Sequence, residues 1–293
     1  MTSEANLIYA APIMEREQAL EHVTSVVRAS GTSFYWAMRM LPRQKRDAMY
    51  AVYAFCREVD DIADDPGLED DKLRRLADWR VEIERLYAGR PKLPVSLALM
   101  DPIEAFGLRK EVFLSVIEGM EIDAVEAVRM PTIAALEAYC DRVACAVGRL
   151  SNRIFGIDDV RGEPVAWSLG QALQLTNILR DLAEDAAIDR LYVPNDMLAV
   201  YDIPPNSPQR AILHPRFPEV CAELANLAQR RYADAAVALA VCDRRTMRPA
   251  IMMMQNYRRI LDRLVNRGWQ CPDQPVSLGK AQKIWILLCY GLI

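Results

Sequence analysis

The chain has 293 residues, of which 52% are hydrophobic, and is therefore long enough to bury one large core. Its net charge of -4 and its two histidines argue against a nucleic-acid-binding protein, a histidine zinc centre and a Ser-His catalytic triad. Seven scattered cysteines without a Cys-x-x-Cys pair indicate reduced thiols in a cytoplasm.

Apolar residues recur with the helical period along almost every segment, and no run alternates convincingly as a strand does. We therefore predict an all-α fold in one domain over 1–293, in which residues 1–15 form a poorly ordered extension. The predicted helices are 16–29, 43–65, 70–88, 109–124, 132–155, 161–187, 217–240, 247–266 and 279–290. The amino terminus lacks the basic start and apolar core of a signal peptide, so we expect a cytoplasmic protein.

The helix over 43–65 ends in a cluster of aspartates. Asp60 and Asp64 are four residues apart, so both carboxylates project from one face about one turn apart and repel each other. Pro66 and Gly67 end the helix here, at the negative end of its dipole. A solvated surface is the simplest interpretation of one such cluster, and a bound cation is the alternative.

The helix over 161–187 has the same construction. Gln174, Asn177, Asp181 and Asp185 form a ladder on one face, with Arg180 beside it, on a helix that is otherwise rich in Ala and Leu. Buried polar groups need partners, so the ladder lines a wet cavity or binds a ligand. Two clusters of this kind favour a magnesium site that carries a diphosphate, because Mg²⁺ prefers carboxylate and phosphate oxygens.

Three further residues near these clusters have alternative interpretations. Arg57 lies on the face of Asp60, where it either contacts a phosphate or forms a simple salt bridge. Arg190 and Tyr192 follow the second cluster in a predicted loop at the cavity mouth. They either close over a substrate or belong to a surface loop without a role.

Residues 284–293 form a mostly apolar run, about half as long as a membrane-spanning helix. We expect this run to be the last core helix. The alternative is an interfacial segment, preceded by Lys280 and Lys283, that contacts the inner face of the membrane peripherally.

Four motifs of the chain resemble those of the squalene and phytoene synthase family. They are Ser33-Phe34-Tyr35-Trp36-Ala37, Tyr53-Ala54-Phe55-Cys56-Arg57-Glu58-Val59-Asp60-Asp61-Ile62-Ala63-Asp64, Tyr139-Cys140-Asp141-Arg142-Val143-Ala144 and Gln174-Leu175-Thr176-Asn177-Ile178-Leu179-Arg180-Asp181-Leu182-Ala183-Glu184-Asp185. Together with Met120-Glu121-Ile122-Asp123-Ala124, they look most like the bacterial presqualene diphosphate synthases of hopanoid biosynthesis.

The resemblance implies an isoprenoid synthase helical bundle with a central cavity. It also implies dependence on several Mg²⁺ ions and a head-to-head condensation of two farnesyl diphosphate molecules to presqualene diphosphate. It implies no NADPH, since that cofactor serves the bifunctional squalene synthases. A downstream enzyme of squalene formation is an implied partner.

The resemblance also implies roles for individual residues. Asp60, Asp64, Asp181 and Asp185, with Asn177, match metal-binding positions. Residues expected to contact diphosphate or its metals are Arg57, Gln174, Asn177 and Arg180. Those expected around the reacting ends are Ser33, Phe34, Tyr53 and Tyr139, and weaker matches are Tyr257 and Lys283. Tyr53, Tyr139, Arg57 and Arg180 are the catalytic candidates, and either Tyr139 or the departing diphosphate accepts the proton.

Two kinds of alternative stay open. Within the family these are a phytoene or dehydrosqualene synthase and a squalene synthase that completes the reduction. Outside enzymes, the alternative is a non-catalytic lipid-binding or assembly protein on the same fold, although such a protein should lose metal ligands and all four matched aspartates are present.

Overall fold

The computed structural model describes residues 13–31 and 34–279, and in these residues the only strands form one short parallel pair. The helices are α1 (Ile13–Ala29), α2 (Phe34–Arg39), α3 (Arg43–Asp64), α4 (Glu69–Tyr87), α5 (Pro94–Phe106), α6 (Lys110–Asp123), α7 (Ile133–Cys140), α8 (Ala146–Phe155), α9 (Asp159–Arg180), α10 (Leu182–Ala187), α11 (Asn195–Val200), α12 (Pro208–Ile212), α13 (Phe217–Ala240) and α14 (Arg248–Arg267). Strand β1 (Val128–Arg129) pairs with β2 (Arg190–Leu191). The predicted all-α fold is confirmed.

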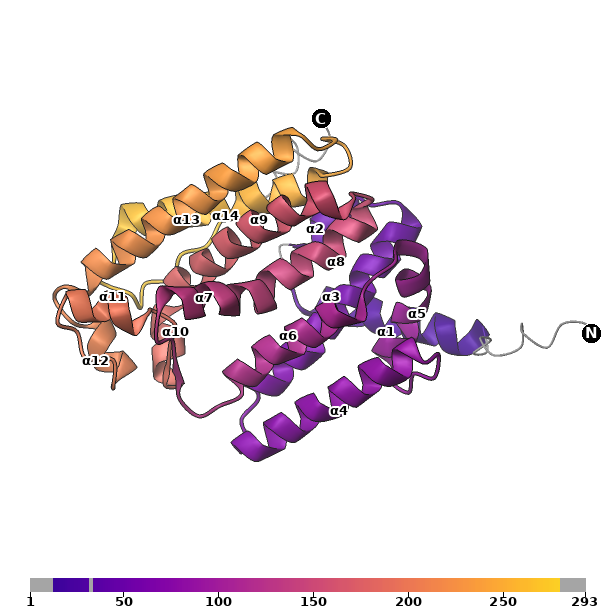
Figure 1. Cartoon of the computed structure of the whole chain (residues 1–293), viewed down its shortest axis with the longest axis horizontal. Coiled ribbons are helices and arrows are strands. Elements are labelled where there is room, and N and C mark those ends of the chain that lie inside the picture. Colours follow the sequence, from indigo (N-terminus) through magenta and orange to yellow (C-terminus); the bar gives the residue numbers. More distant parts are fainter. Residues whose placement is uncertain (1–12, 32–33, 280–293) are drawn as a thin grey trace, which may run out of the picture.

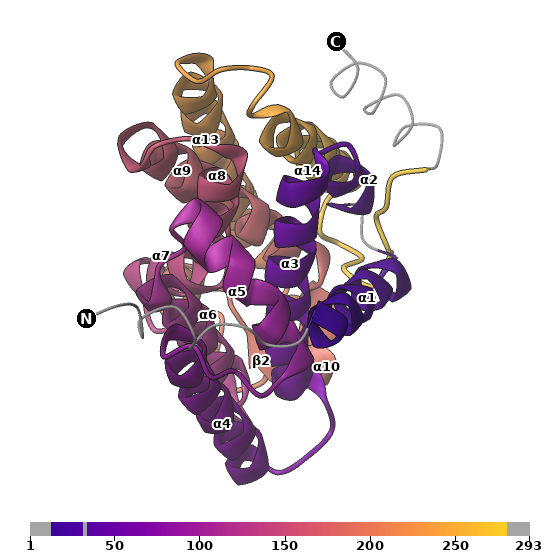
Figure 2. The same cartoon turned by 90° about the vertical axis from the view of Figure 1, so that its right-hand side faces the viewer.

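Helix α9 lies in the middle of the bundle (Figure 1). It packs against α13, α14 and α8, and α3 lies beyond α8 with α6 and α4 on its outer side. The view along the helices in Figure 2 shows α2 next to α14 and α3, far from α4. Side chains from α2, α3, α8, α9 and α14 enclose a cavity at the centre of the bundle.

The long predicted helices have their counterparts in α1, α3, α4, α6, α13 and α14. The structure adds α2, α5, α11 and α12, which the sequence reading missed because they are short or begin at a proline. Pro94 and Pro208 stand in the first turns of α5 and α12, where a missing N–H costs nothing.

The predicted helix over 132–155 is divided by a π-helical turn, Asp141–Cys145, between α7 and α8. Helix α9 crosses this turn very closely, because a Cβ atom on Gly170 would lie 2.7 Å from the backbone of Cys145. Glycine is therefore required where the two helices meet. Val143 and Ala144 of the turn line the central cavity, so the turn shapes one of its walls.

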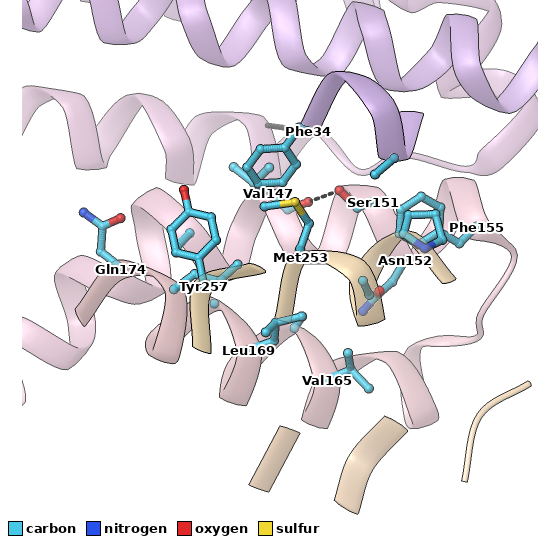
Figure 3. A pocket seen from close by; sticks show the side chains of 18 of the residues that line it. Phe34, Val147, Ser151, Asn152, Phe155, Val165, Leu169, Gln174, Met253 and Tyr257 are labelled. Atoms are coloured by element: carbon cyan, nitrogen blue, oxygen red, sulfur yellow. Dashed lines mark hydrogen bonds between the residues drawn. The ribbon is translucent and has the colours of Figure 1, made fainter. Parts of the chain in front are cut away.

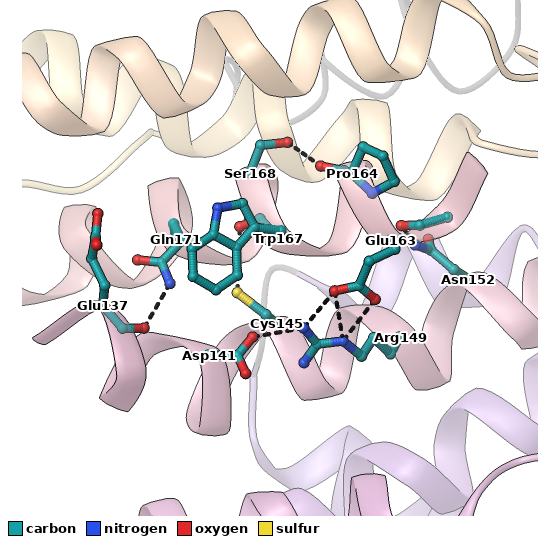
Figure 4. Close-up of polar contacts among 11 residues, drawn as sticks. Glu137, Asp141, Cys145, Arg149, Asn152, Glu163, Pro164, Trp167, Ser168 and Gln171 are labelled. Carbon is teal, nitrogen blue, oxygen red and sulfur yellow. Dashed lines mark hydrogen bonds and ion pairs between the residues drawn. The ribbon is translucent and has the colours of Figure 1, made fainter. Parts of the chain in front are cut away.

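An ion network on the outer side holds this turn in place (Figure 4). Arg149 of α8 donates to Asp141 at 2.7 Å and to Glu163 of α9 at 2.6 Å. Gln171 of α9 donates to the backbone carbonyl of Glu137 at 2.8 Å. The network ties α7, the π-helical turn and α8 to α9.

Several predictions fall on residues outside the described ranges. These are the roles of Ser33 and Lys283, and the structure of the apolar run 284–293. Helix α1 begins at Ile13, three residues before the predicted helix over 16–29. The single domain over 1–293 stays a prediction. None of the helices within the described ranges is both long and apolar enough to cross a membrane.

Candidate active site

The first aspartate cluster lies at the end of α3, as predicted. Arg57 on the same helix donates to Asp60 at 3.1 Å and pairs with Asp61 at 2.5 Å. Burial and the neighbouring charge of Asp64 raise the pKa of Asp60 to about 6. The salt bridge expected as the simple interpretation of Arg57 is therefore present, and Arg57 also lies beside the carboxylates that would hold a metal.

The second cluster lies at a break between two helices. The predicted helix 161–187 was wrong in one respect, because α9 ends at Arg180 and Asp181 has φ -101° and ψ 13° before α10 begins. The N–H of Asp185 still donates to the carbonyl of Asp181 at 2.8 Å, so the one-turn relation of the pair survives. Arg180 donates to both oxygens of Asp181, at 2.7 and 2.6 Å.

Arg190 of β2 connects the first cluster to the end of α6. Its guanidinium donates to Asp64 at 2.7 Å, to the carbonyl of Ala63 at 3.0 Å and to the carbonyl of Asp123 at 2.8 Å. Burial, then the charge of Asp181, raise the pKa of Asp185 to about 7, and Asp123 and Asp64 add to this effect. The two clusters therefore share one electrostatic site.

Asp123 is a site residue that the sequence reasoning did not assign. It ends α6, is 6% exposed, and accepts hydrogen bonds from Tyr139 at 2.8 Å and Tyr192 at 2.7 Å. The two tyrosine rings stack with their centroids 5.1 Å apart. Burial raises the pKa of Asp123 to about 6. The two hydrogen bonds and the charge of Arg190 act in the opposite direction, and burial outweighs them. Its only signal in the sequence is its place in the motif 120–124, since no second acid stands four residues away.

Of the two interpretations of the loop over Arg190 and Tyr192, the surface loop without a role is wrong. Both residues are buried, at 8% and 6% exposure, because Arg190 belongs to β2 and pairs with Val128 of β1. Asp189 precedes them with φ 61°, a left-handed conformation that aspartate tolerates better than most residues. Its carboxylate accepts from Arg129 at 2.7 Å, which holds the turn.

The central cavity begins one turn from the second cluster (Figure 3). Gln174 and Tyr257 lie at one end and Phe155 and Asn152 at the other, with a mostly apolar lining between them. Asn177 lines the polar end, and its carbonyl accepts from the N–H of Asp181 at 2.9 Å. The cavity is suited to an apolar chain whose charged end reaches the aspartates.

Some of the predicted site residues line this cavity and others lie outside it. Phe34, Gln174, Asn177 and Tyr257 line it. The pKa of Tyr257 is raised by burial with a contribution from Tyr53, against the opposing effect of Arg180. Tyr139 and Tyr192 do not line the cavity; both donate to Asp123. The structure thus brings Gln174, Asn177 and Tyr257 together at the polar end of the cavity, and the roles of the individual residues stay predictions.

The oxygen donors fit a magnesium ion that shares its ligands with a substrate. The Oδ1 atom of Asn177 is buried without a hydrogen-bond partner, and its amide nitrogen donates to Gln174 at 3.3 Å. Within the described ranges, no three acidic, histidine or cysteine side chains converge on one ion position. Mg²⁺ sites in proteins commonly use one or two carboxylates together with water and phosphate oxygens.

Comparison with known proteins decides the family. The family model described as squalene/phytoene synthase matches residues 27–282. The chain belongs to this family. A presqualene diphosphate synthase from Rhodopseudomonas palustris is 45% identical over 90% of this chain and 95% of its own. The corresponding protein from Sinorhizobium fredii is 41% identical over 95% of this chain and 99% of its own.

A dehydrosqualene synthase crystal structure shares the fold, with a TM-score of 0.82 at 24% identity over 96% of this chain and 98% of its own. The family typically uses Mg²⁺. The relatives confirm the predicted enzyme class, a prenyltransferase of the presqualene diphosphate synthase type.

Proposed function

We propose that this protein joins two molecules of farnesyl diphosphate head to head into presqualene diphosphate, with release of one diphosphate, in a Mg²⁺-dependent reaction. The observation that carries the proposal is an apolar cavity whose polar end, at Gln174 and Asn177, lies one helical turn from Asp181. The first cluster is near enough for Asp64 to act on Asp185. The named relatives support the same reaction.

In this proposal, Asp60, Asp64, Asp181 and Asp185, with Asn177, hold the metal. Bound Mg²⁺ would neutralise the negative charge that grows on the departing diphosphate.

Arg57 and Arg180 bind and orient the diphosphate groups. Each guanidinium carries five N–H donors. In the structure Arg57 uses donors on Asp60 and Asp61, and Arg180 uses donors on Asp181. Each arginine therefore has further N–H groups that can donate to phosphate oxygens. The planar guanidinium group matches the geometry of these oxygens.

The cavity protects the allylic cation that remains when the carbon–oxygen bond of the first substrate breaks. Its apolar lining excludes water, and the aromatic face of Phe34 can stabilise a cation by cation–π attraction. Tyr53, half-buried on α3 near Tyr257, is proposed to act in the same way. The double bond of the second substrate attacks the cation, and loss of a proton closes a cyclopropane ring.

The departing diphosphate is the better candidate for the acceptor of that proton. Burial and the charge of Asp123 raise the pKa of Tyr139 well above its usual value, so Tyr139 stays a phenol. Its hydroxyl already donates to Asp123. Tyr139 therefore holds its proton at Asp123 and orients that carboxylate.

Incubation of the purified protein with farnesyl diphosphate and Mg²⁺, without NADPH, tests the proposal. Mass analysis should detect presqualene diphosphate and one released diphosphate per condensation. Recovery of untouched substrate would support the non-catalytic alternative. A C40 product from geranylgeranyl diphosphate, with no C30 product from farnesyl diphosphate, would identify a phytoene synthase instead.

A further inference from the structure

Helix α2 has an inner and an outer face with opposite environments. On the inner face, Phe34, Ala37 and Met38 line the central cavity. On the outer face, Trp36 is 51% exposed, and Met40 directly after the helix is 39% exposed. A helix this short thus separates the apolar cavity from a surface that presents a large aromatic ring to solvent.

A basic side chain accompanies the exposed ring. The guanidinium of Arg39 lies 5.5 Å from the ring centroid of Trp36 and 6.0 Å from that of Tyr35. The two rings contact each other edge to face at 5.4 Å. Cation–π attraction therefore holds one positive charge over an aromatic pair on the outer face of α2.

More arginines surround this face from the neighbouring helices. Arg28 of α1 and Arg46 of α3 lie close enough to act, together with Arg39, on the hydroxyl of Tyr50. Arg43 stands at the start of α3 with its side chain 85% exposed.

Asp47 is the acidic partner on this face, at 3.6 Å from Arg43 and 3.3 Å from Arg46. Arg43 and Arg46 thus share one aspartate, on a chain whose net charge is -4. The positive charge is local, and it lies beside the exposed aromatic pair.

We propose that this face, formed by Tyr35, Trp36, Arg39 and Met40 with Arg28, Arg43 and Arg46 around them, docks on an anionic phospholipid bilayer. Tryptophan and tyrosine rings favour the boundary between headgroups and acyl chains. Arginines beside them gain from the negative potential of anionic headgroups. Because this face combines interfacial aromatic rings with positive charge, an anionic lipid surface is the partner that fits it.

Docking in this orientation would place the wall of the prenyl cavity against the bilayer. The inner and outer faces of α2 are about one helix diameter apart, of the order of 10 Å. The proposal goes beyond the condensation reaction and is independent of it, since it concerns where the protein binds and not which bond it forms.

Vesicle flotation of the full chain tests the docking surface. We expect binding to phosphatidylcholine vesicles that contain phosphatidylglycerol, and little binding to phosphatidylcholine alone. Trp36→Ser should weaken binding to the anionic vesicles about tenfold, and Arg39→Gln should weaken it about fivefold. Added salt should weaken it further, because it screens the arginines.

Matched controls lie on the distant α4 side of the bundle (Figure 2). Leu68 is 71% exposed just before α4, and Arg74 of α4 is exposed and pairs with Asp71 at 2.8 Å. Leu68→Ser and Arg74→Gln should leave vesicle binding unchanged. Equal losses in these controls, or equal binding to both kinds of vesicle, would overturn the proposal.

Tryptophan fluorescence separates docking from shielding by the protein itself. The difference spectrum between the wild type and Trp36→Phe should show a water-exposed emission that shifts to the blue with anionic vesicles. An emission that is already blue without vesicles would mean that another part of the chain, such as 280–293, covers Trp36, and would contradict the proposal. Unchanged circular dichroism melting of each variant verifies the fold.

Discussion

The two aspartate clusters have the same spacing and different surroundings. Asp64 lies on the uninterrupted α3 and its side chain is 51% exposed, whereas Asp181 lies at a helix break and its side chain is 26% exposed. Arg180 precedes Asp181 directly, while Arg190, the partner of Asp64, comes 126 residues later in the chain. A local pattern can therefore place two carboxylates on one face without specifying which cation balances them.

Removing one carboxylate from each cluster should have the largest effect. We expect Asp60→Asn and Asp181→Asn each to lower turnover about 100-fold or more, since each removes a charge that acts on the departing diphosphate. The free energy of unfolding of Asp60→Asn should change by less than about 1 kcal/mol, because its pair with Arg57 is exposed and the substitution relieves like-charge repulsion. Product formation and thermal melting check the two expectations.

The control for these variants is Asp65→Asn. Asp65 directly follows α3 and pairs with Arg75 at 3.4 Å, outside the proposed metal ligands. Its turnover should stay near that of the wild type. Near-normal turnover in both Asp60→Asn and Asp181→Asn would contradict the metal assignment.

Arg190, which connects distant segments, should contribute more to the free energy of unfolding than Arg57, which pairs within its own helix. Arg190→Gln should lower the free energy of unfolding by about 3 kcal/mol, because the carbonyls of Ala63 and Asp123 lose a buried charged donor. Arg57→Gln should cost less than about 1 kcal/mol, since its pairs are exposed. Urea unfolding measures both, and equal losses would show that Arg190 has no special structural role.

Loss of a hydrogen bond to Asp123 should have a moderate effect. Tyr192→Phe should cost about 1 to 2 kcal/mol, because a buried carboxylate loses a donor. The same substitution in an Asp123→Asn background should cost less. Denaturant unfolding of the single and double variants checks the coupling, and full additivity would argue against it.

A pH dependence of the metal-free protein is also expected. Burial and Asp181 raise the pKa of Asp185 from 3.8 to about 7, so between these pH values the folded chain holds a proton that the unfolded chain has lost. The stability contributed by this proton is complete below pH 3.8 and is lost as the pH rises through about 7. Asp185→Asn should show a flatter melting curve against pH over this range. A steeper dependence in the variant would contradict this origin.

Helix geometry explains which parts of the site were predictable. The spacing of Asp60 with Asp64 places both on one face of α3, and the ladder from Gln174 to Asp181 follows the same rule on α9. Asp123 has no such partner in its own helix, because its hydrogen bonds come from Tyr139 and Tyr192. Residues whose partners are distant in the chain leave no periodic signal.

The sequence by itself determined the helical class, the two aspartate pairs and the polar ladder, since each depends on contacts within one or two turns of a helix. Tertiary structure alone decided that β2 is buried, that Arg190 joins Asp64 to the end of α6, and that α9 breaks at Asp181. These features depend on which helices pack together. Packing sets the burial and the distant partners that give each carboxylate its charge environment.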